Sequence, residues 1–555
     1  MRNLFNHNHF LGYVNEVTPQ YVRIHFPSSR LLQSFYHDGL PMPGGHVGCF
    51  VMIEGEQYGF LARVAEVALP DSERKSITEK SILEDDSTFH PSGKAELLLS
   101  FDIYNPSKAE KTVGRYPHLG SKVYACSDEQ ISRYVSRFGG SDESAIHSSL
   151  GKLVSNNVEC NISLDALFGR HCAVLGTTGG GKSWTMAKLM EQVQSKAHNK
   201  IILIDATGEY MGLLGIEHCI VGKDSYFPYS QLSNSDFCSL FREHSPNTST
   251  ILCEAINTLR LVGAGILGSG VKVGQTVANL SLQISKNLPA CTNKDFDLQS
   301  LYEQVRNECV KEQGGKYVED VFKLGYSAHL LARINLFLNN ETVKSALGMN
   351  NQAETNPQLR KHKSIMETIE SFCTGKSSIL RIGFEDLSYD FAVREIIVDF
   401  IATQLLRKGR QNAFKEKPIL LFIDEAHQFL NKRLSADDDT SFYLQGIELI
   451  AKEARKYGLF LCLSTQMPRD IPLAILSQMG TFIVHRLINE QDKKAIESAA
   501  SSLNKSMLSF LPTMGAGEAL LMGVDFPMPL LLKIASPEQK PQSETPKLSK
   551  KNSND

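Results

Sequence analysis

The sequence predicts an α/β fold in which a β-barrel precedes a core of parallel strands and a helical subdomain interrupts that core. Three observations predict this arrangement. A glycine-rich loop at 176–183 lies between a short apolar stretch and a stretch with helical spacing. Four mainly apolar runs, at 171–175, 200–205, 419–423 and 459–463, have the composition of buried strands. The first 150 residues alternate apolar and polar side chains between turn signals, as the short strands of a small barrel do.

The loop matches the pattern G-x-x-x-x-G-K-[ST]. Its glycines let several backbone N–H groups turn inward, and the following helix adds its positive N-terminal end, so the loop forms a site for phosphate. We expect Lys182 to reach the β- and γ-phosphates and Ser183 to offer its hydroxyl to Mg²⁺. The backbone N–H of Trp184 is expected near the α-phosphate. The sequence therefore predicts that ATP and Mg²⁺ bind here, with these residues around the nucleotide: Gly176, Thr178, Gly179, Gly180, Gly181, Lys182, Ser183 and Trp184.

Polar residues at two strand ends supply the rest of a hydrolytic site. A phosphate loop needs an acid that holds Mg²⁺ and a group that positions water. Asp424 and Glu425 directly follow the run 419–423, so we expect Asp424 to hold Mg²⁺ and Glu425 to polarise the attacking water. Gln466 follows the run that begins at 459 and is expected to sense the γ-phosphate. The alternative for Gln466 is a polar cap on the strand end.

Other polar residues leave alternatives open. Asp205 and Glu209 follow the run 200–205 and lie at the same edge of the sheet, where ligands bind. Asp205 is either a partner of the metal ligands or a turn residue. Arg455, at the end of a helix expected over 445–457, is either a cation that favours a helix C-terminus or an arginine that completes a neighbouring subunit's nucleotide site. Arg486 is the competing candidate for that second role.

These motifs together resemble the HerA branch of the HerA/FtsK ATPases. The resemblance is carried by the loop Gly176–Ser183, by Asp205-Ala-Thr-Gly-Glu-Tyr210, Asp424-Glu-Ala-His427, Ala454-Arg-Lys-Tyr-Gly458 and Ser464-Thr-Gln466, and by Gly515-Ala-Gly-Glu-Ala519, which resembles the closing hairpin of that family's core. It implies a RecA-like P-loop ATPase core in a homo-hexameric ring that threads or pumps double-stranded DNA. It also implies nucleotide between subunits, hence a residue acting in trans. Asp-Ala-Thr at 205–207 departs from the family, whose members often have a Pro and a His there.

Composition limits the function classes. The formal net charge of −3 is not that of a strongly basic nucleic-acid binder, so DNA binding is expected from the resemblance alone. One basic cluster, Arg407-Lys408-Gly409-Arg410 followed by Lys415 and Lys417, is either a contact for DNA or a solvated helix end. No run of eighteen apolar residues and no signal-peptide pattern occurs, which favours a cytoplasmic protein without a membrane segment. Eleven cysteines without a C-x-x-C pair predict reduced thiols rather than disulfides or a zinc site.

Four parts are expected along the chain. Residues 1–150 form the barrel, which the resemblance places before the motor. Residues 151–224 and 391–535 form the ATPase core, and 225–390 form a helical insertion with helices over 249–261, 294–313 and 321–338 and a flexible break at 263–274. Residues 536–555, rich in Lys, Pro, Ser, Glu and Gln, form a disordered tail.

The sequence thus predicts an ATP-hydrolysing hexameric DNA translocase or helicase. No nuclease constellation is present, and the resemblance implies a separate effector, such as a nuclease or a NAD-consuming sirtuin-like protein, in DNA end processing or anti-phage defence. The alternative is an ATP-binding ring that assembles and regulates an effector with little translocation of its own. A membrane-linked conjugation or division pump shares such a core, but the absence of an apolar span argues against it.

Overall fold

A computed structural model describes residues 5–19, 21–74, 89–105, 109–111, 115–135, 138–139, 145–243, 245–289, 291, 295–349, 363–430, 445–500, 508–526 and 528–543. The chain divides into two compact units. The first unit contains Met1–His198, Ser464–Arg469 and Leu476–Lys540, and the second contains Asn199–Leu463, Asp470–Ile475 and Pro541–Asp555. The last twelve residues of the expected tail lie outside the described residues.

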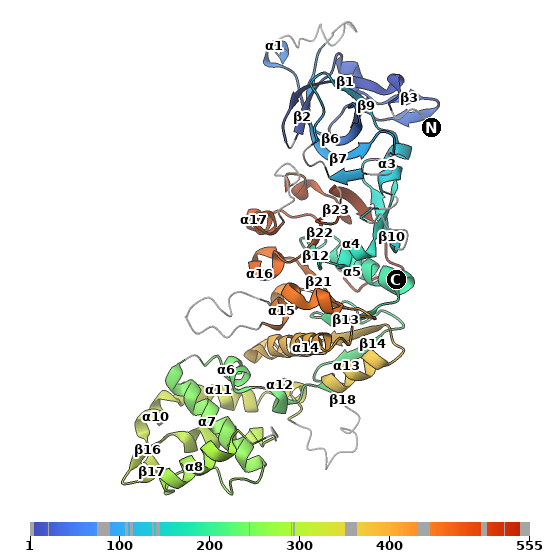
Figure 1. The fold of residues 1–555 in the computed structure, drawn as a ribbon. Helices are drawn as coiled ribbons and strands as arrows, with labels where there is room; N and C mark the ends of the chain where they lie inside the picture. Colours follow the sequence, from blue (N-terminus) through green and yellow to red (C-terminus); the bar gives the residue numbers. More distant parts are fainter. Residues whose placement is uncertain are drawn as a thin grey trace, which may run out of the picture. The chain divides into compact units, whose positions relative to one another are not determined.

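The N-terminal part of the first unit is a closed β-barrel. Its strands are β1 (Phe10–Val17), β2 (Tyr21–His25), β5 (Phe50–Ile53), β6 (Tyr58–Ala68), β7 (Ser92–Asp102), β8 (Ala109–Lys111) and β9 (Lys122–Ala125). They pair in the order β2-β1-β9-β5-β6-β7-β8, and β2 also pairs with β7, which closes six strands into a barrel (Figure 1). Alternate side chains such as Leu11, Val22 and Val51 fill its interior. The predicted N-terminal barrel is therefore confirmed.

The rest of the first unit forms a sheet that carries the phosphate loop. Its strands are β10 (His147–Leu153), β11 (Glu159–Ser163), β12 (Cys172–Leu175), β22 (Thr481–Val484), β23 (Glu518–Gly523) and β24 (Leu530–Ile534). They follow one another as β11-β10-β24-β23-β22-β12. β12 and β22 are parallel, and β23 and β24 form an antiparallel hairpin at the place where the sequence predicts the closing hairpin. Helices α4 (Leu164–Phe168) and α5 (Lys182–Gln192) precede and follow β12.

The second unit is built on a parallel sheet. Its strands are β13 (Lys200–Asp205), β14 (Glu217–Ile220), β19 (Ile379–Gly383), β20 (Ile419–Ile423) and β21 (Leu459–Thr465). They lie in the order β21-β20-β13-β19-β14, and the central three are almost entirely buried, because apolar residues occupy both faces. Helices α14 (Val393–Arg410) and α15 (Gly446–Glu453) pack against each other beside the sheet. β19 lies inside the range expected for the insertion, so the core sheet resumes at Ile379.

The segment between β14 and β19 is largely helical, as expected. It contains α6 (Asn234–Leu240), α7 (Pro246–Gly263), α8 (Val277–Asn287), α9 (Leu301–Glu308), α10 (Val321–Tyr326), α11 (Ala328–Leu338), α12 (Glu341–Ala346) and α13 (Ile365–Thr374), with the short parallel strands β15 (Ser225–Tyr226) and β18 (Lys363–Ser364). Two expectations were wrong in detail. The helix expected to reach Gln313 ends at Glu308 and a hairpin, β16 (Val310–Gln313) and β17 (Lys316–Glu319), follows it. The stretch expected over 321–338 breaks at Ser327 into α10 and α11.

The glycine-rich stretch 263–274 is anchored in the structure, although a flexible break was expected. The Gly270 carbonyl accepts a hydrogen bond of 2.9 Å from Gln304. The Lys272 ammonium, which is buried, pairs with the buried carboxylate of Glu308. Thr258 and Gln304 also donate to that carboxylate, so the charge pair is well satisfied.

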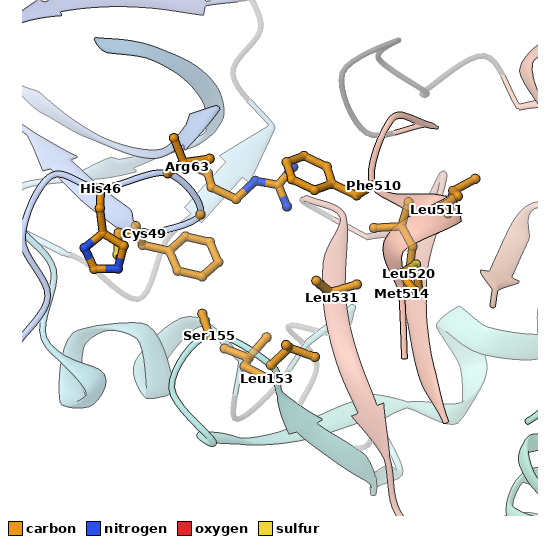
Figure 2. A pocket seen from close by; sticks show the side chains of 14 residues that line it. His46, Cys49, Arg63, Leu153, Ser155, Phe510, Leu511, Met514, Leu520 and Leu531 are labelled. Carbon is orange, nitrogen blue, oxygen red and sulfur yellow. The ribbon is translucent and has the colours of Figure 1, made fainter. Parts of the chain in front are cut away.

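A cavity of about 210 Å³ lies in the first unit between barrel residues and the β10 and β23–β24 strands (Figure 2). Its walls are mainly apolar and include Phe50, Leu520 and Leu531. Arg63 on β6 reaches across, with its guanidinium carbon 5.5 Å from the centre of the Phe510 ring and a 3.3 Å ion pair to buried Glu96. This cation–π contact ties the barrel to the segment before β23.

Among the described residues, no helix combines the length and apolar character that crossing a membrane requires.

Candidate nucleotide site

The phosphate loop connects β12 to α5, as the sequence predicts. Gly176 has φ 155°, and a Cβ there would lie 2.6 Å from the Cβ of His485, so no larger residue fits. Gly181 precedes α5 with φ 112° and gives the helix no side-chain cap. The first N–H groups of α5 therefore face the loop without a competing side-chain acceptor, which is the arrangement that binds phosphate.

Lys182 and Gln466 both lie at this loop. The Lys182 ammonium is buried and lies 3.5 Å from the Thr177 carbonyl, so its side chain folds back over the loop. The Thr178 hydroxyl donates to Oε1 of Gln466, at the end of β21. The structure thus brings Gln466 beside the phosphate loop, and its role as a γ-phosphate sensor stays a prediction.

His485 packs against the phosphate loop. No role was assigned to it from the sequence. It follows β22, and its backbone N–H donates to Leu175 at 2.7 Å. Its Nδ1 donates to the Glu518 carbonyl at 2.8 Å, so Nε2 accepts the Thr185 hydroxyl at 2.9 Å. Burial, together with the nearby charge of Lys182, lowers the pKa of His485 to about 4. The imidazole is therefore neutral and acts as a fixed brace between α5 and the β23–β24 hairpin.

The hairpin also contacts the loop directly. The Gly517 N–H donates to the Gly180 carbonyl at 3.0 Å. Arg486 contributes its backbone, because its carbonyl accepts from the N–H of Thr177 at 2.9 Å and from the Thr177 hydroxyl at 3.1 Å. The Arg486 side chain is half-buried beside its own subunit's loop.

Ser183 and Trp184, in the first turn of α5, are half-buried. The Lys540 ammonium lies 5.1 Å from the centre of the Trp184 ring, and the Glu538 N–H donates to Glu191 at 2.8 Å. The first residues of the segment expected to be a tail therefore run along α5.

The acidic pair lies in the second unit, at the carboxyl end of β20. Asp424 is buried, and its N–H donates to the Ile204 carbonyl of β13 at 2.9 Å. Glu425 has φ 44° and ψ 49°, a left-handed conformation that costs a residue with a side chain about 1–3 kcal/mol. Nδ1 of His427 lies 3.2 Å from Oε2 of Glu425. Such local strain is typical of positions where a functional side chain is held in one direction.

Of the two alternatives for Asp205, a partner of the metal ligands or a turn residue, its hydrogen bonds favour the turn residue. Its carboxylate accepts the N–H groups of Thr207, Gly208 and Tyr210 at 3.3, 2.9 and 3.1 Å. It also forms a fully buried 2.7 Å ion pair with Arg381 of β19. These bonds satisfy the buried charge and fix the 205–210 loop.

Tyr210 shows that the four acidic residues of this edge lie near one another. Burial first, and then the charges of Asp424, Asp205, Glu209 and Glu425, raise the pKa of its hydroxyl well above the usual value. The hydroxyl is fully buried, as is the ring. Asp205 is paired with Arg381, so Asp424, Glu209 and Glu425 are the carboxylates of this edge whose charge favours a divalent cation.

The cationic candidates differ in exposure. Arg455 lies in the 3₁₀ turn η10 (Ala454–Tyr457) that follows α15, and its side chain is exposed. In the basic cluster at the end of α14, Lys408 pairs with Glu370 at 3.0 Å and Arg410 pairs with Glu453. Two of the cluster's five charges are thus partly neutralised, as is typical of a solvated helix end.

The residues fit a magnesium nucleotide by their chemistry. The uncapped start of α5 and the glycine cradle suit phosphate oxygens. A serine hydroxyl and an aspartate carboxylate are the oxygen ligands that Mg²⁺ takes alongside phosphate and water. Strand, loop and helix, with an acidic strand end in the same chain, define a P-loop ATPase.

Comparison with known proteins gives the family. The model "Helicase HerA, central domain" matches residues 146–387, and "Helicase HerA-like C-terminal" matches residues 398–549. The chain belongs to the HerA family of ATPases.

Similar proteins include a probable helicase of Methanocaldococcus jannaschii, 26% identical over 83% of this chain and 82% of its own length. The DNA double-strand break repair helicase HerA of Sulfolobus acidocaldarius is 25% identical over 78% of this chain and 76% of its own length. Among solved structures, VirB4 of Thermoanaerobacter pseudethanolicus covers 71% of this chain and 97% of its own, with a TM-score of 0.44 and 16% identity.

Proposed function

We propose that this chain is the subunit of a homo-hexameric ring that hydrolyses ATP to move double-stranded DNA. The observation that carries the proposal is the phosphate loop: a glycine cradle, an uncapped helix start and Gln466 joined to the loop through Thr178. DNA as the substrate is supported by the relatives, several of which are named as DNA double-strand break repair helicases.

Each residue has a distinct task in this proposal. Lys182 neutralises the β- and γ-phosphates, and the N–H groups that open α5 hold the phosphate oxygens. Ser183 and Asp424 hold Mg²⁺, which supplies charge neutralisation of the phosphates. Glu425 accepts a proton from the attacking water, and its fixed backbone keeps the carboxylate in one direction. Gln466 contacts the γ-phosphate and is linked to the phosphate loop by its hydrogen bond with Thr178.

An arginine from a neighbouring subunit completes the site. Arg455 is favoured over Arg486 because its side chain is exposed, whereas the Arg486 backbone holds its own subunit's loop. An arginine supplied in trans stabilises charge in the transition state and couples hydrolysis to subunit contacts.

The motor works with a separate effector in this proposal, either a nuclease or a NAD-consuming sirtuin-like enzyme, in DNA end processing or anti-phage defence. The competing function is a ring that binds ATP to assemble and gate that effector.

Two measurements separate these functions. The mass of the assembly is measured with and without ATP, and ATP turnover is measured with and without duplex DNA. A translocase is expected to form a hexamer, to hydrolyse ATP faster on duplex DNA and to displace a protein bound to that DNA. ATP-dependent assembly without roadblock displacement would favour the scaffold. No affinity for ATP under any assembly condition would overturn both.

A further inference from the structure

Two cysteines of the helical insertion lie side by side on different helices. Cys238 is in the last turn of α6, and Cys253 is two turns into α7. Their sulfur atoms are 3.8 Å apart. A disulfide requires about 2.0 Å between the sulfurs and Cα atoms within about 7 Å, so adjacent thiols on packed helices need only a small movement to join.

Hydrogen bonds next to the pair hold the two helices together. Arg260 of α7 donates to Oδ1 of Asn234 and to the Leu232 carbonyl, both at 2.8 Å, at the start of α6. The Asn234 amide donates to Asn257 at 3.1 Å. These bonds hold the two helices, and with them the two sulfur atoms, near each other.

The two thiols differ in exposure and in acidity. Cys238 is buried, whereas Cys253 is partly exposed. The two thiols are within hydrogen-bond distance of each other, and this contact, with the charge of Arg260, lowers the pKa of Cys253 below its usual value. The same contact and burial raise the pKa of Cys238. Since the thiolate is the reactive form, Cys253 is the residue that an oxidant attacks first.

We propose that Cys238 and Cys253 form a reversible redox modification site whose oxidants are peroxides and small disulfides. With hydrogen peroxide, the Cys253 thiolate attacks one peroxide oxygen, and the other oxygen leaves as water after taking a proton, giving a sulfenic acid. The Cys238 sulfur then attacks the Cys253 sulfur, and the hydroxyl leaves as a second water with the Cys238 proton. The two thiols lose two electrons to the peroxide, and an added dithiol restores them.

A disulfide here would fix the end of α6 to α7 and close the loop between them. That loop contains Arg242, which has φ 46°. Because α6 also packs against α14 of the ATPase core, the cross-link would join the insertion's first two helices into one rigid element beside the core.

The test uses the full-length protein, reduced and then treated with hydrogen peroxide. Remaining thiols are alkylated, and the digested peptides are identified by mass spectrometry. We expect a peptide pair joined through Cys238 and Cys253, which disappears on treatment with dithiothreitol. Cys373 is the internal control, because it is also partly exposed but burial raises the pKa of its thiol.

Two variants assign the roles. Cys253→Ser is expected to abolish the cross-link, whereas Cys238→Ser is expected to leave a sulfenic acid on Cys253 that dimedone traps. A second measurement needs no variant: the pH dependence of iodoacetamide labelling in the reduced protein should show Cys253 reacting at lower pH than Cys373. Equal labelling of the two residues, with no joined peptide after peroxide, would overturn the proposal.

Discussion

Glu425 combines a strained backbone with the side chain that we assign to proton transfer. In Glu425→Gln the left-handed backbone and the side-chain length are kept, but the group no longer accepts a proton. We expect the turnover number to fall by about 10²–10⁴-fold while ATP still binds, because the loop that holds the phosphates is untouched. Steady-state hydrolysis and titration with a fluorescent nucleotide measure the two effects separately.

Lys182→Ala is the matched variant for Glu425→Gln. It removes the charge that faces the phosphates, so ATP affinity and hydrolysis should both be lost. If Lys182→Ala still hydrolyses ATP faster on DNA, or if Glu425→Gln turns over like the unmodified protein, the assigned roles are wrong.

Asp399 is a partly buried carboxyl on α14 that accepts the Gly446 N–H at 2.7 Å. Burial raises its pKa to about 6, and the charge of Asp236 adds to the rise. The folded state therefore binds a proton more readily than the unfolded state, and stability from this group falls as pH rises from about 4 to 6. Asp399→Asn keeps an acceptor for Gly446 without the charge, so at pH 7–8 we expect it to stabilise the protein by about 1–2 kcal/mol.

Denaturant unfolding at pH 8 and at pH 4 checks this prediction. The gain should shrink towards pH 4, where the native aspartic acid is already protonated. A destabilised Asp399→Asn at pH 8 would contradict it. Asp390→Asn, which changes an aspartate in the 3₁₀ turn η7 (Asp390–Ala392) just before α14, is the control for a general effect of removing a charge.

The sequence predicts some residue roles better than others. Gly176–Ser183 and Asp424-Glu425 could be found because each motif lies within one stretch of chain beside a strand. Asp205 stayed ambiguous, since its partner Arg381 is 176 positions away and inside an apolar strand. His485 was missed because its two bonds reach residues 300 positions earlier and 33 positions later. The one sequence feature that could have indicated its role is a histidine directly after the mainly apolar strand residues 481–484.

At the scale of elements, His485 couples the phosphate loop to the β23–β24 hairpin. His485→Phe keeps an aromatic ring but leaves the Thr185 hydroxyl and the Glu518 carbonyl without this partner, at a cost of about 1–3 kcal/mol each. We expect a lower melting temperature and weaker ATP binding, measured by thermal unfolding with and without nucleotide. Thr185→Val removes only one of the two bonds and should have a smaller effect.

The hydrogen bonds of neutral His485 also make the stability of the folded state depend on pH. The folded pKa of His485 is about 4, below the usual 6.5, so the unfolded state binds the proton more readily. The stability that this neutral histidine contributes is present above about pH 6.5 and is lost as pH falls towards 4. In His485→Phe that part of the acid sensitivity should be absent. An unchanged acid profile in the variant would exclude a neutral His485 as its cause.

Elements with a uniform pattern were predictable, and elements that change type within a few residues were not. The buried strands β13, β20 and β21 are apolar runs, and no helix competes for so short a segment. The helix expected over 294–313 ends early because Gly314 and Gly315, with φ 63° and 76°, turn the chain into the hairpin β16–β17. A Gly-Gly pair between short polar-apolar stretches is a hairpin signal that the helical spacing before it obscured.

At the scale of the whole molecule, the predicted site residues are distributed over the two compact units of the chain. The phosphate loop, Gln466 and Arg486 belong to the first unit, and Asp424, Glu425 and Arg455 belong to the second. The order of the motifs predicts a single core with an insertion, but it does not predict this division. The boundary between the units falls inside strand β21, whose last two residues belong to the first unit. The apolar pattern of this strand is continuous, so the sequence gives no sign of a boundary there.

An arginine acting in trans makes a prediction about mixed rings. Arg455→Ala and Lys182→Ala are each expected to lose about 10³-fold or more in hydrolysis when assayed alone. In an equal mixture, the Arg455→Ala subunits supply an intact Lys182 and the Lys182→Ala subunits supply an intact Arg455. The two intact residues face each other at about a quarter of the interfaces of a cyclic ring. Hydrolysis should therefore recover in the mixture. If the arginine acted within its own subunit, no chain would hold both residues and mixing would restore nothing. Arg486→Ala in the same mixture tests the competing arginine, and full activity of Arg455→Ala alone would remove Arg455 from the site.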